Sequence, residues 1–102
     1  MEFGALLRSL RYRDGLGIKK LAPGLGVTHG YLSKLENTEA QPSEELLERV
    51  AAYFNYDSGE IFLSAGRVPP DVVEILRNNP HEALDYLRAR FGNGKLQTGR
   101  DG

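Results

Sequence analysis

Hydrophobic residues recur every three or four positions through most of this chain, which is the spacing of one face of an α-helix. In residues 3–65 the pattern predicts five helices, and no alternating run typical of a β-strand lies between them. The helices are expected over about residues 3–13, from Ile18 to about Leu25, from Thr28 to Glu36, from Ser43 to Phe54, and over about residues 58–65. The predicted fold class is therefore all-α.

The ends of these helices carry residues suited to capping. Thr28 and Ser43 have side-chain oxygens that accept a backbone N–H of the first helical turn, and Gly15 supplies a left-handed exit from the first helix. Pro23 lacks a backbone donor, so the second helix is expected to end early or to bend. The inward side of the fifth helix is expected to carry Ile61, Phe62 and Leu63.

Glycine and proline residues between positions 66 and 70 interrupt the chain, and a second segment follows. A helical run opens at Asp71, breaks at Asn79-Pro80 and resumes from His81 to Phe91, which predicts a C-terminal helical hairpin over residues 69–91. Residues 92–102 are rich in glycine and polar residues without periodicity, and we expect a disordered tail there. The predicted domain organisation is therefore 1–66, 67–91 and 92–102.

The composition fits one compact domain with a short appendage. The chain has 102 residues, of which 40% are hydrophobic and 26% are charged, and this is enough apolar material for a core. It contains no cysteine, which excludes a disulfide framework and a thiolate metal site. The sequence has neither a signal-peptide pattern at its start nor an apolar run long enough to span a membrane, so we expect a cytoplasmic location and no membrane partner.

Few residue types suited to catalysis are available. The imidazoles are His29 and His81, and the sequence has no glycine-rich phosphate loop and no HExxH motif. Acidic residues of the fourth predicted helix, such as Glu44 and Glu48, have the spacing of a solvated face. We therefore predict that the chain is not an enzyme and that it requires neither a metal nor a cofactor.

The charge is unevenly distributed, although the net charge is only -1. Residues 1–37 carry six basic and three acidic side chains, a net charge of +3, whereas residues 38–66 carry one basic and six acidic side chains, a net charge of -5. A basic segment followed by an acidic segment can orient the molecule on a polyanion such as DNA. An ordinary mixed surface is the alternative interpretation.

Two longer runs and a Pro-Ser pair form a specific pattern. They are GLGIKKLA at residues 15–22, GVTHGYLSKLEN at residues 26–37, and Pro42-Ser43. With these residues, the span 3–65 resembles the Cro and lambda-repressor type of helix-turn-helix domain, also called the xenobiotic-response-element family. The resemblance implies a five-helix lambda-repressor-like DNA-binding domain in which the second and third helices read double-stranded DNA.

The resemblance also implies roles for individual residues. The base-reading positions on the exposed side of the third helix fall on His29, Gly30 and Lys34. Contacts to the DNA backbone are expected from Lys19, Lys20, Thr28, Tyr31, Ser33 and Asn37. Arg11 and Glu36 match a pair that often forms a partly buried ion pair between the first and third helices of the family. The alternatives are that His29 and the lysines are solvated surface residues, and that Tyr31 is half-buried packing.

Three features depart from the family pattern, and one of them is Pro23 within the second helix. Gly17-Ile18 stands where the family commonly has Ser or Thr followed by Gln, so the DNA contact of that Gln is lost or replaced. Thr38 stands where the family tends to have glycine. Because a β-branched residue tolerates a positive φ poorly, the turn after the third helix is expected to differ.

The leading functional prediction is a DNA-binding transcriptional regulator, specifically a repressor that binds a two-fold operator as a homodimer. The C-terminal hairpin is the candidate dimer or partner element because it has an apolar stripe formed by Val72, Val73, Ile75, Leu76, Leu84, Leu87 and Phe91. Two alternatives are open. The hairpin packs on its own domain, or the chain is an antitoxin or partner-controlled protein-interaction module whose C-terminal helices bind another protein.

Overall fold

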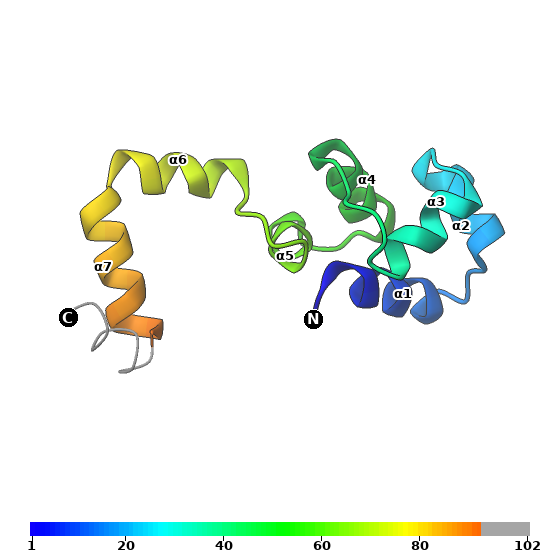
Figure 1. Ribbon diagram of the computed structural model, residues 1–102, viewed down its shortest axis with the longest axis horizontal. Coiled ribbons are helices and arrows are strands. Elements are labelled where there is room, and N and C mark those ends of the chain that lie inside the picture. The colour runs from blue at the N-terminus through cyan, green and yellow to red at the C-terminus, as the bar shows by residue number, and fades with distance from the viewer. Residues whose placement is uncertain (93–102) are drawn as a thin grey trace. The chain divides into compact units, whose positions relative to one another are not determined.

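The computed structural model describes residues 1–92, which form seven helices and contain no β-strand (Figure 1). This confirms the all-α prediction. The chain divides into two compact units, Met1–Pro69 and Pro70–Gly102. The helices of the first unit are α1 (Phe3–Arg13), α2 (Ile18–Leu25), α3 (His29–Glu36), α4 (Glu44–Phe54) and α5 (Ser58–Ser64), and those of the second are α6 (Pro70–Asn78) and α7 (Pro80–Phe91).

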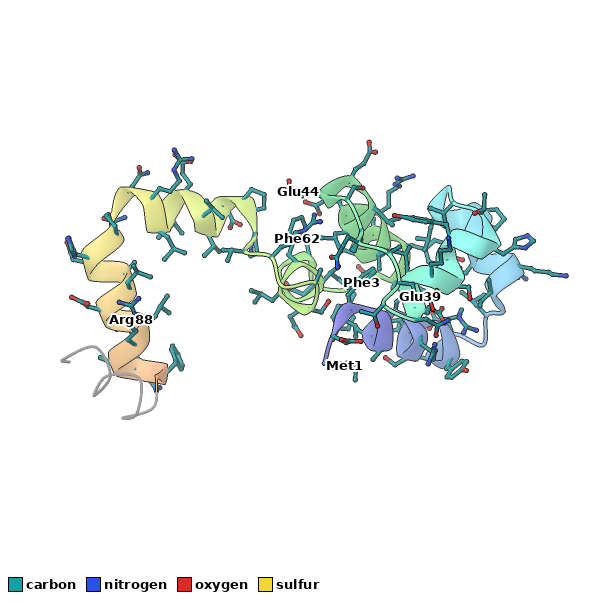
Figure 2. The ribbon with its side chains drawn as sticks, viewed as in Figure 1. Met1, Phe3, Glu39, Glu44, Phe62 and Arg88 are labelled. Atoms are coloured by element: carbon teal, nitrogen blue, oxygen red, sulfur yellow. The ribbon has the colours of Figure 1, made fainter. Side chains whose placement is uncertain are left out.

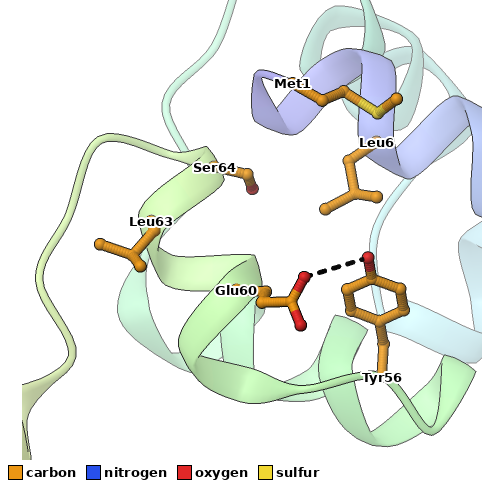
Figure 3. A pocket seen from close by; sticks show the side chains of 6 residues that line it. All are labelled: Met1, Leu6, Tyr56, Glu60, Leu63 and Ser64. Atoms are coloured by element: carbon orange, nitrogen blue, oxygen red, sulfur yellow. Dashed lines mark hydrogen bonds between the residues drawn. The ribbon is translucent and has the colours of Figure 1, made fainter. Parts of the chain in front are cut away.

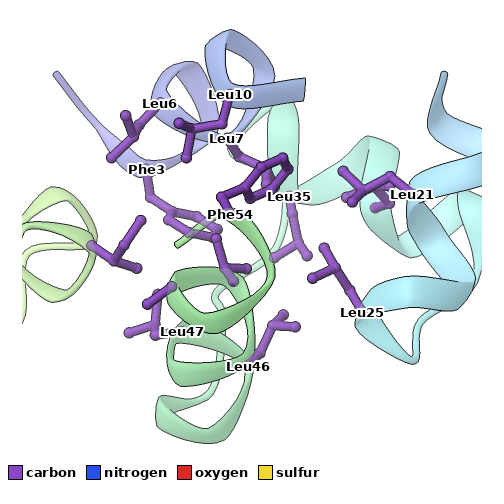
Figure 4. Packing of buried hydrophobic residues seen from close by; sticks show 14 of the residues in the cluster. Phe3, Leu6, Leu7, Leu10, Leu21, Leu25, Leu35, Leu46, Leu47 and Phe54 are labelled. Carbon is purple, nitrogen blue, oxygen red and sulfur yellow. The ribbon is translucent and has the colours of Figure 1, made fainter. Parts of the chain in front are cut away.

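The five helices of the first unit enclose a single apolar core. Leucines from α1, α2, α3 and α4 meet phenylalanines from α1 and α4 at its centre (Figure 4). Each such side chain contributes about 1.5–3 kcal/mol when it is removed from water. The largest fully buried side chains are those of Leu7, Leu21, Leu25, Leu32, Leu35, Leu47, Val50, Ile61 and Phe62.

Gly4 allows α1 to approach the end of α3 more closely than any side chain would permit. A Cβ atom at Gly4 would lie 2.6 Å from the carbonyl oxygen of Glu36 and 2.8 Å from that of Leu35. These are backbone atoms, which have little freedom to retreat. The absence of a side chain at Gly4 therefore fixes the distance between the two helices.

All five helices of the first unit end in the same backbone motif. After α3, the Thr38 N–H donates to the Leu35 carbonyl at 3.3 Å and the Glu39 N–H donates to the Lys34 carbonyl at 2.8 Å, a Schellman pair that satisfies the last carbonyls of the helix. The residue in the left-handed conformation at each of the five ends is, in chain order, Gly15, Gly26, Thr38, Asn55 and Gly66.

The prediction that the turn after α3 differs from the family pattern is wrong. Thr38 adopts the ordinary left-handed conformation with φ 63°, although this conformation costs a non-glycine residue about 1–2 kcal/mol. The two backbone hydrogen bonds of the motif offset that cost, and the Thr38 hydroxyl also donates to Glu2 Oε1 at 3.0 Å.

Two further local expectations are corrected by the structure. The early end expected for α2 is wrong: Pro23 lies inside α2, which continues to Leu25, because the proline removes only one hydrogen bond from a helix whose inner face is buried. Leu63 is 61% exposed, whereas Ile61 and Phe62 are buried. Successive helical residues are turned by about 100°, so three consecutive side chains cannot all face the core.

The second unit consists of two successive helices, as predicted. Asn79 separates them, its side-chain amide donates to the Ile75 carbonyl at 3.0 Å, and Pro80 begins α7. No residue of α6 or α7 is buried in the described part of the chain, and side chains project from both helices (Figure 2). Of the tail expected over residues 92–102, all but Gly92 lies outside the described residues.

The described helices are short. The longest, α7, has 12 residues, and within residues 1–92 no helix combines the length and apolar character needed to cross a membrane.

Candidate nucleic-acid interface

The helices α2 and α3 form a compact two-helix unit whose turn is held in place from α4. Gly26 closes α2 in the left-handed conformation, with φ 72°. The Arg49 side chain reaches this turn from α4 and donates to the Leu25 carbonyl at 3.0 Å. At the start of α3, the Thr28 hydroxyl accepts the Tyr31 N–H at 3.1 Å, as predicted for an N-cap. The entry of α3 is thereby fixed relative to α2.

One side of α3 is buried and the other contains its exposed residues. Leu32, Leu35 and Glu36 are buried. The predicted base-reading positions His29, Gly30 and Lys34 are exposed, as are Thr28 and Asn37 at the two ends, whereas Tyr31 and Ser33 are half-buried. Lys19 and Lys20 are exposed at the start of α2. The predicted site residues therefore lie on the solvent side of the two-helix unit, and the core holds its other side.

Tyr31 is held by the protein itself. Its ring packs against the edge of the hydrophobic core, and its hydroxyl donates to the Gln41 carbonyl at 3.3 Å. A phenol has one O–H proton, and this bond uses it. This hydrogen bond favours a packing role for Tyr31 over a phosphate contact. It also connects the loop after α3 to α3.

An ion pair joins α1 to the end of α3. Arg11 donates through Nε to Glu36 Oε2 at 2.6 Å and through Nη2 to Glu36 Oε1 at 2.8 Å, the two-pronged geometry in which guanidinium and carboxylate match. The two side chains are only 9% and 2% exposed. Arg11 also donates to the Leu16 carbonyl at 3.1 Å, which fixes the segment leading into α2. The predicted pair thus braces three elements at once.

Burial and hydrogen bonding act in opposite directions on this pair. Burial alone raises the pKa of the Glu36 carboxyl, but hydrogen bonds from Arg11 and Arg8 and their positive charges lower that pKa by more, so it lies below its ordinary value. For Arg11, the hydrogen bond to Glu36 raises the guanidinium pKa despite its burial. Both groups are therefore fully ionised at neutral pH.

Arg8 also belongs to this site, although it was not among the residues predicted from the sequence. Arg8 donates through Nε to Glu36 Oε1 at 3.3 Å and through Nη2 to Asn37 Oδ1 at 2.8 Å. A signal was present in the sequence, because Arg8 precedes Arg11 by three positions and the two side chains share a face of the first helix. The partner Asn37 could not be found from spacing, since it lies 29 positions away.

A separate hollow of about 380 Å³ lies between α1 and α5 (Figure 3). Its lining includes Tyr56, whose hydroxyl donates to Glu60 Oε1 at 3.5 Å, and no described lining residue is a histidine, lysine or arginine. Elsewhere in residues 1–92, no three His, Asp or Glu side chains are grouped closely enough to hold a metal ion. The polar side chains in the described lining of the hollow are those of Tyr56, Glu60 and Ser64.

Residues 2–61 match the family model described as a helix-turn-helix domain, which is more than half of the chain. The chain therefore belongs to the helix-turn-helix family, and the predicted family membership is confirmed. The matched span contains α1 to α4 and most of α5, so it includes the whole of the two-helix unit and its bracing ion pair.

Individual proteins agree with this assignment. The chain is 37% identical over 60 residues to the HTH-type transcriptional regulator SlrR of Bacillus subtilis, an overlap of 58% of this chain and 40% of SlrR. It thus spans less than half the length of that relative. Among solved structures, the clp gene regulator ClgR of Corynebacterium glutamicum has a TM-score of 0.56 and 26% identity, covering 89% of this chain and 92% of ClgR.

A structure of the SinR protein/SinI protein complex has a TM-score of 0.55 and covers 89% of this chain and 99% of the matched one. Its 22% identity shows likeness of fold alone. These matches confirm the lambda-repressor-like fold class. SlrR and ClgR are named as regulators rather than enzymes, in agreement with the prediction that this chain is not an enzyme.

Proposed function

We propose that this chain is a sequence-specific DNA-binding transcriptional regulator that inserts α3 into the major groove. The observation that carries the proposal is the division of α3 into a side whose leucines are buried and an opposite side that exposes His29, Gly30 and Lys34. A helix held in this way is a rigid rod that fits a groove about 12 Å wide. The name of SlrR, an HTH-type transcriptional regulator, supports the same function.

Each exposed position has a role in this proposal. Lys34 donates to O6 or N7 of a guanine, and His29 donates or accepts at a purine edge. Gly30 has open space where a Cβ would lie, so the α3 backbone approaches the base edges there. Lys19 and Lys20 bind phosphates next to the unpaired N–H groups at the start of α2. Thr28, Ser33 and Asn37 are the polar groups nearest the DNA backbone along α3.

Comparing two lysine variants tests the assignment of these roles. A duplex enriched from a random pool is titrated with Lys34→Ala and Lys19→Ala proteins. Lys34→Ala should change the preference at one base pair by about 1–3 kcal/mol, whereas Lys19→Ala should weaken all duplexes alike and reduce the salt dependence by about one ion. If neither variant alters binding, α3 is not the reading helix. The random pool also reveals whether the bound sequence has two-fold symmetry.

We further propose that the protein acts as a repressor and binds a two-fold operator as a homodimer through α6 and α7. These two helices bury none of their residues within the described chain, and Val72, Ile75, Leu84, Leu87 and Phe91 are between 36% and 71% exposed. Apolar side chains presented at this density usually mark an interface. A dimer also doubles the number of base contacts, which one small module needs for useful specificity.

Light scattering tests the dimer. The full chain should have twice the mass expected for one copy, and a chain ending at Gly66 should be monomeric. Leu84→Glu in the full chain should also give a monomer, whereas Tyr86→Glu serves as a control in the same helix at a more exposed position, 65% against 39% for Leu84. A dimer that persists in the shortened chain would exclude α6 and α7 as its interface. Repression itself predicts lower expression from a reporter whose promoter overlaps the selected duplex.

The alternative is that α6 and α7 bind a different protein, as in an antitoxin or a partner-controlled regulator. The likeness in fold to a chain solved in the SinR protein/SinI protein complex supports this alternative. In that case the isolated full chain should be a monomer, and an unrelated protein should bind residues 67–102 with a defined stoichiometry. Leu84→Glu should then abolish binding of that protein and leave the mass of the isolated chain unchanged.

A further inference from the structure

We infer that Arg8 and Asn37 together form a binding site for one DNA backbone phosphate at the C-terminal end of α3. The inference rests on the proposed DNA-binding function and adds to it a residue of α1 and a specific orientation for the Asn37 amide. The starting observation is the 2.8 Å hydrogen bond from Arg8 Nη2 to Asn37 Oδ1, which joins two residues 29 positions apart.

This hydrogen bond determines which way the Asn37 amide points. A guanidinium has donors only, so its partner in the amide must be the oxygen. The nitrogen Nδ2 therefore faces away from Arg8, with both of its N–H groups available. No hydrogen bond to Nδ2 is found within the described part of the protein, and Asn37 is exposed. By holding the amide oxygen, Arg8 thus turns the two N–H donors of Asn37 Nδ2 toward solvent at the end of α3.

The charge at this point is also favourable to an anion. Arg11 and Glu36 neutralise one another in the buried, two-pronged pair. Arg8 makes only a long contact of 3.3 Å with the same carboxylate, and its side chain is 42% exposed. The three groups together carry a net charge of +1, and the excess positive charge lies on Arg8. This matters because the C-terminal end of a helix carries partial negative charge and by itself repels phosphate.

The length of α3 places this end near the edge of the groove. Its eight residues correspond to about 12 Å at 1.5 Å per residue, which is about the width of the major groove. A helix that lies in the groove with its first turn against the bases therefore brings its C-terminal cap close to a sugar-phosphate backbone. One phosphate can accept from Asn37 Nδ2 and from the remaining N–H groups of Arg8.

Salt-dependent binding to a mixed-sequence duplex, followed by fluorescence anisotropy, tests the site. Arg8→Gln should weaken binding about tenfold and lower the slope of log K against log salt concentration by about 0.9. Asn37→Ser removes a neutral donor, so it should weaken binding without changing the slope. The double variant should lose less than the product of the two single losses, because the Asn37 amide is oriented only when Arg8 is present.

Two further variants control for folding and for charge. Arg13→Gln removes an exposed arginine of the same helix, which pairs with Asp14 instead, and it should leave the slope unchanged. Arg8→Lys keeps the charge but offers a single point donor, so it should retain the slope and lose the coupling with Asn37. Thermal unfolding of each variant separates a folding defect from a binding defect, and Arg8→Lys provides the test if Arg8→Gln does not fold.

The outcomes distinguish this inference from the proposal on which it rests. If the unaltered protein binds no duplex at any salt concentration, the proposed function and the phosphate site both fail. If the unaltered protein binds and Arg8→Gln retains the full slope and affinity, only the phosphate site fails. Full additivity of Arg8→Gln and Asn37→Ser would show that the two residues act separately, which would overturn the joint site.

Discussion

Replacing Glu36 by glutamine should remove a large part of the stability of the first unit while leaving its shape unchanged. The carboxylate is 2% exposed and accepts hydrogen bonds from Arg11 at 2.6 Å and 2.8 Å and from Arg8 at 3.3 Å. The amide of glutamine has one acceptor, and its NH₂ group would face an arginine donor. Arg11, at 9% exposure, would then be a buried charge without a counter-ion. Losing one member of a buried pair costs about 3–5 kcal/mol.

This loss is large for so small a unit. Proteins have about 0.05–0.15 kcal/mol of stability per residue, which gives roughly 3–10 kcal/mol for a unit of this length. Urea unfolding followed by circular dichroism should therefore show a much lower midpoint for Glu36→Gln. Asp14→Asn is the matched control, because the Arg13–Asp14 pair is exposed and solvent screening leaves such a pair with little effect on stability. A Glu36→Gln loss no larger than the control would refute the assigned role of the buried pair.

Four other predictions follow from specific contacts. Because the folded protein lowers the pKa of Glu36, the ionised carboxylate stabilises the fold above the unfolded pKa of about 4.3, and this stabilisation is lost as the pH falls through the folded pKa. The difference in stability between Glu36→Gln and the unaltered protein should therefore shrink in acid titrations. A difference that stays constant with pH would contradict this. Gly4→Ala should lower stability by about 1–3 kcal/mol in urea unfolding, because its Cβ would meet backbone atoms at 2.6 Å and 2.8 Å, and a gain of helix stability would show that the contact is soft. Gly30→Ala, which meets open space, should raise stability by about 0.5–1 kcal/mol and weaken duplex binding, so unaltered DNA affinity would place Gly30 away from the bases. Thr38→Asn should add up to about 1 kcal/mol because asparagine tolerates the left-handed conformation better; a lower unfolding midpoint would argue against strain at φ 63°.

Features that depend on neighbouring residues were predictable from the sequence. The caps at Thr28 and Ser43 accept the N–H three residues later, at 3.1 Å in both cases, and the buried side of each helix in the first unit follows its hydrophobic spacing. The errors also have local causes. Leu63 belongs to a run of three apolar residues that cannot share one helical face, and Thr38 adopts a backbone conformation that residue preferences disfavour but that the end of α3 requires.

Features that depend on which helices meet were not predictable from spacing. Gly4 interrupts no pattern in the sequence, and its importance arises only because α3 ends against it. Likewise, Arg49 reaches the Leu25 carbonyl across 24 positions, and Arg8 reaches Asn37 across 29. The family resemblance supplied the pairing of Arg11 with Glu36, because a known fold specifies long-range neighbours. It did not supply the second arginine, Arg8, whose hydrogen bond to Asn37 depends on the folded arrangement.

If α6 and α7 form the proposed dimer interface, the order of these helices, which bury no residue in the described chain, depends on protein concentration. Helices of 9 and 12 residues are marginal in water when nothing covers them. Where a second copy supplies that cover, helix formation and association become one equilibrium, and part of the association energy is spent on ordering the segment. Occupancy of an operator would then rise more steeply than the first power of protein abundance. A few-fold change in expression level would be enough to move such a regulator between inactive and active ranges.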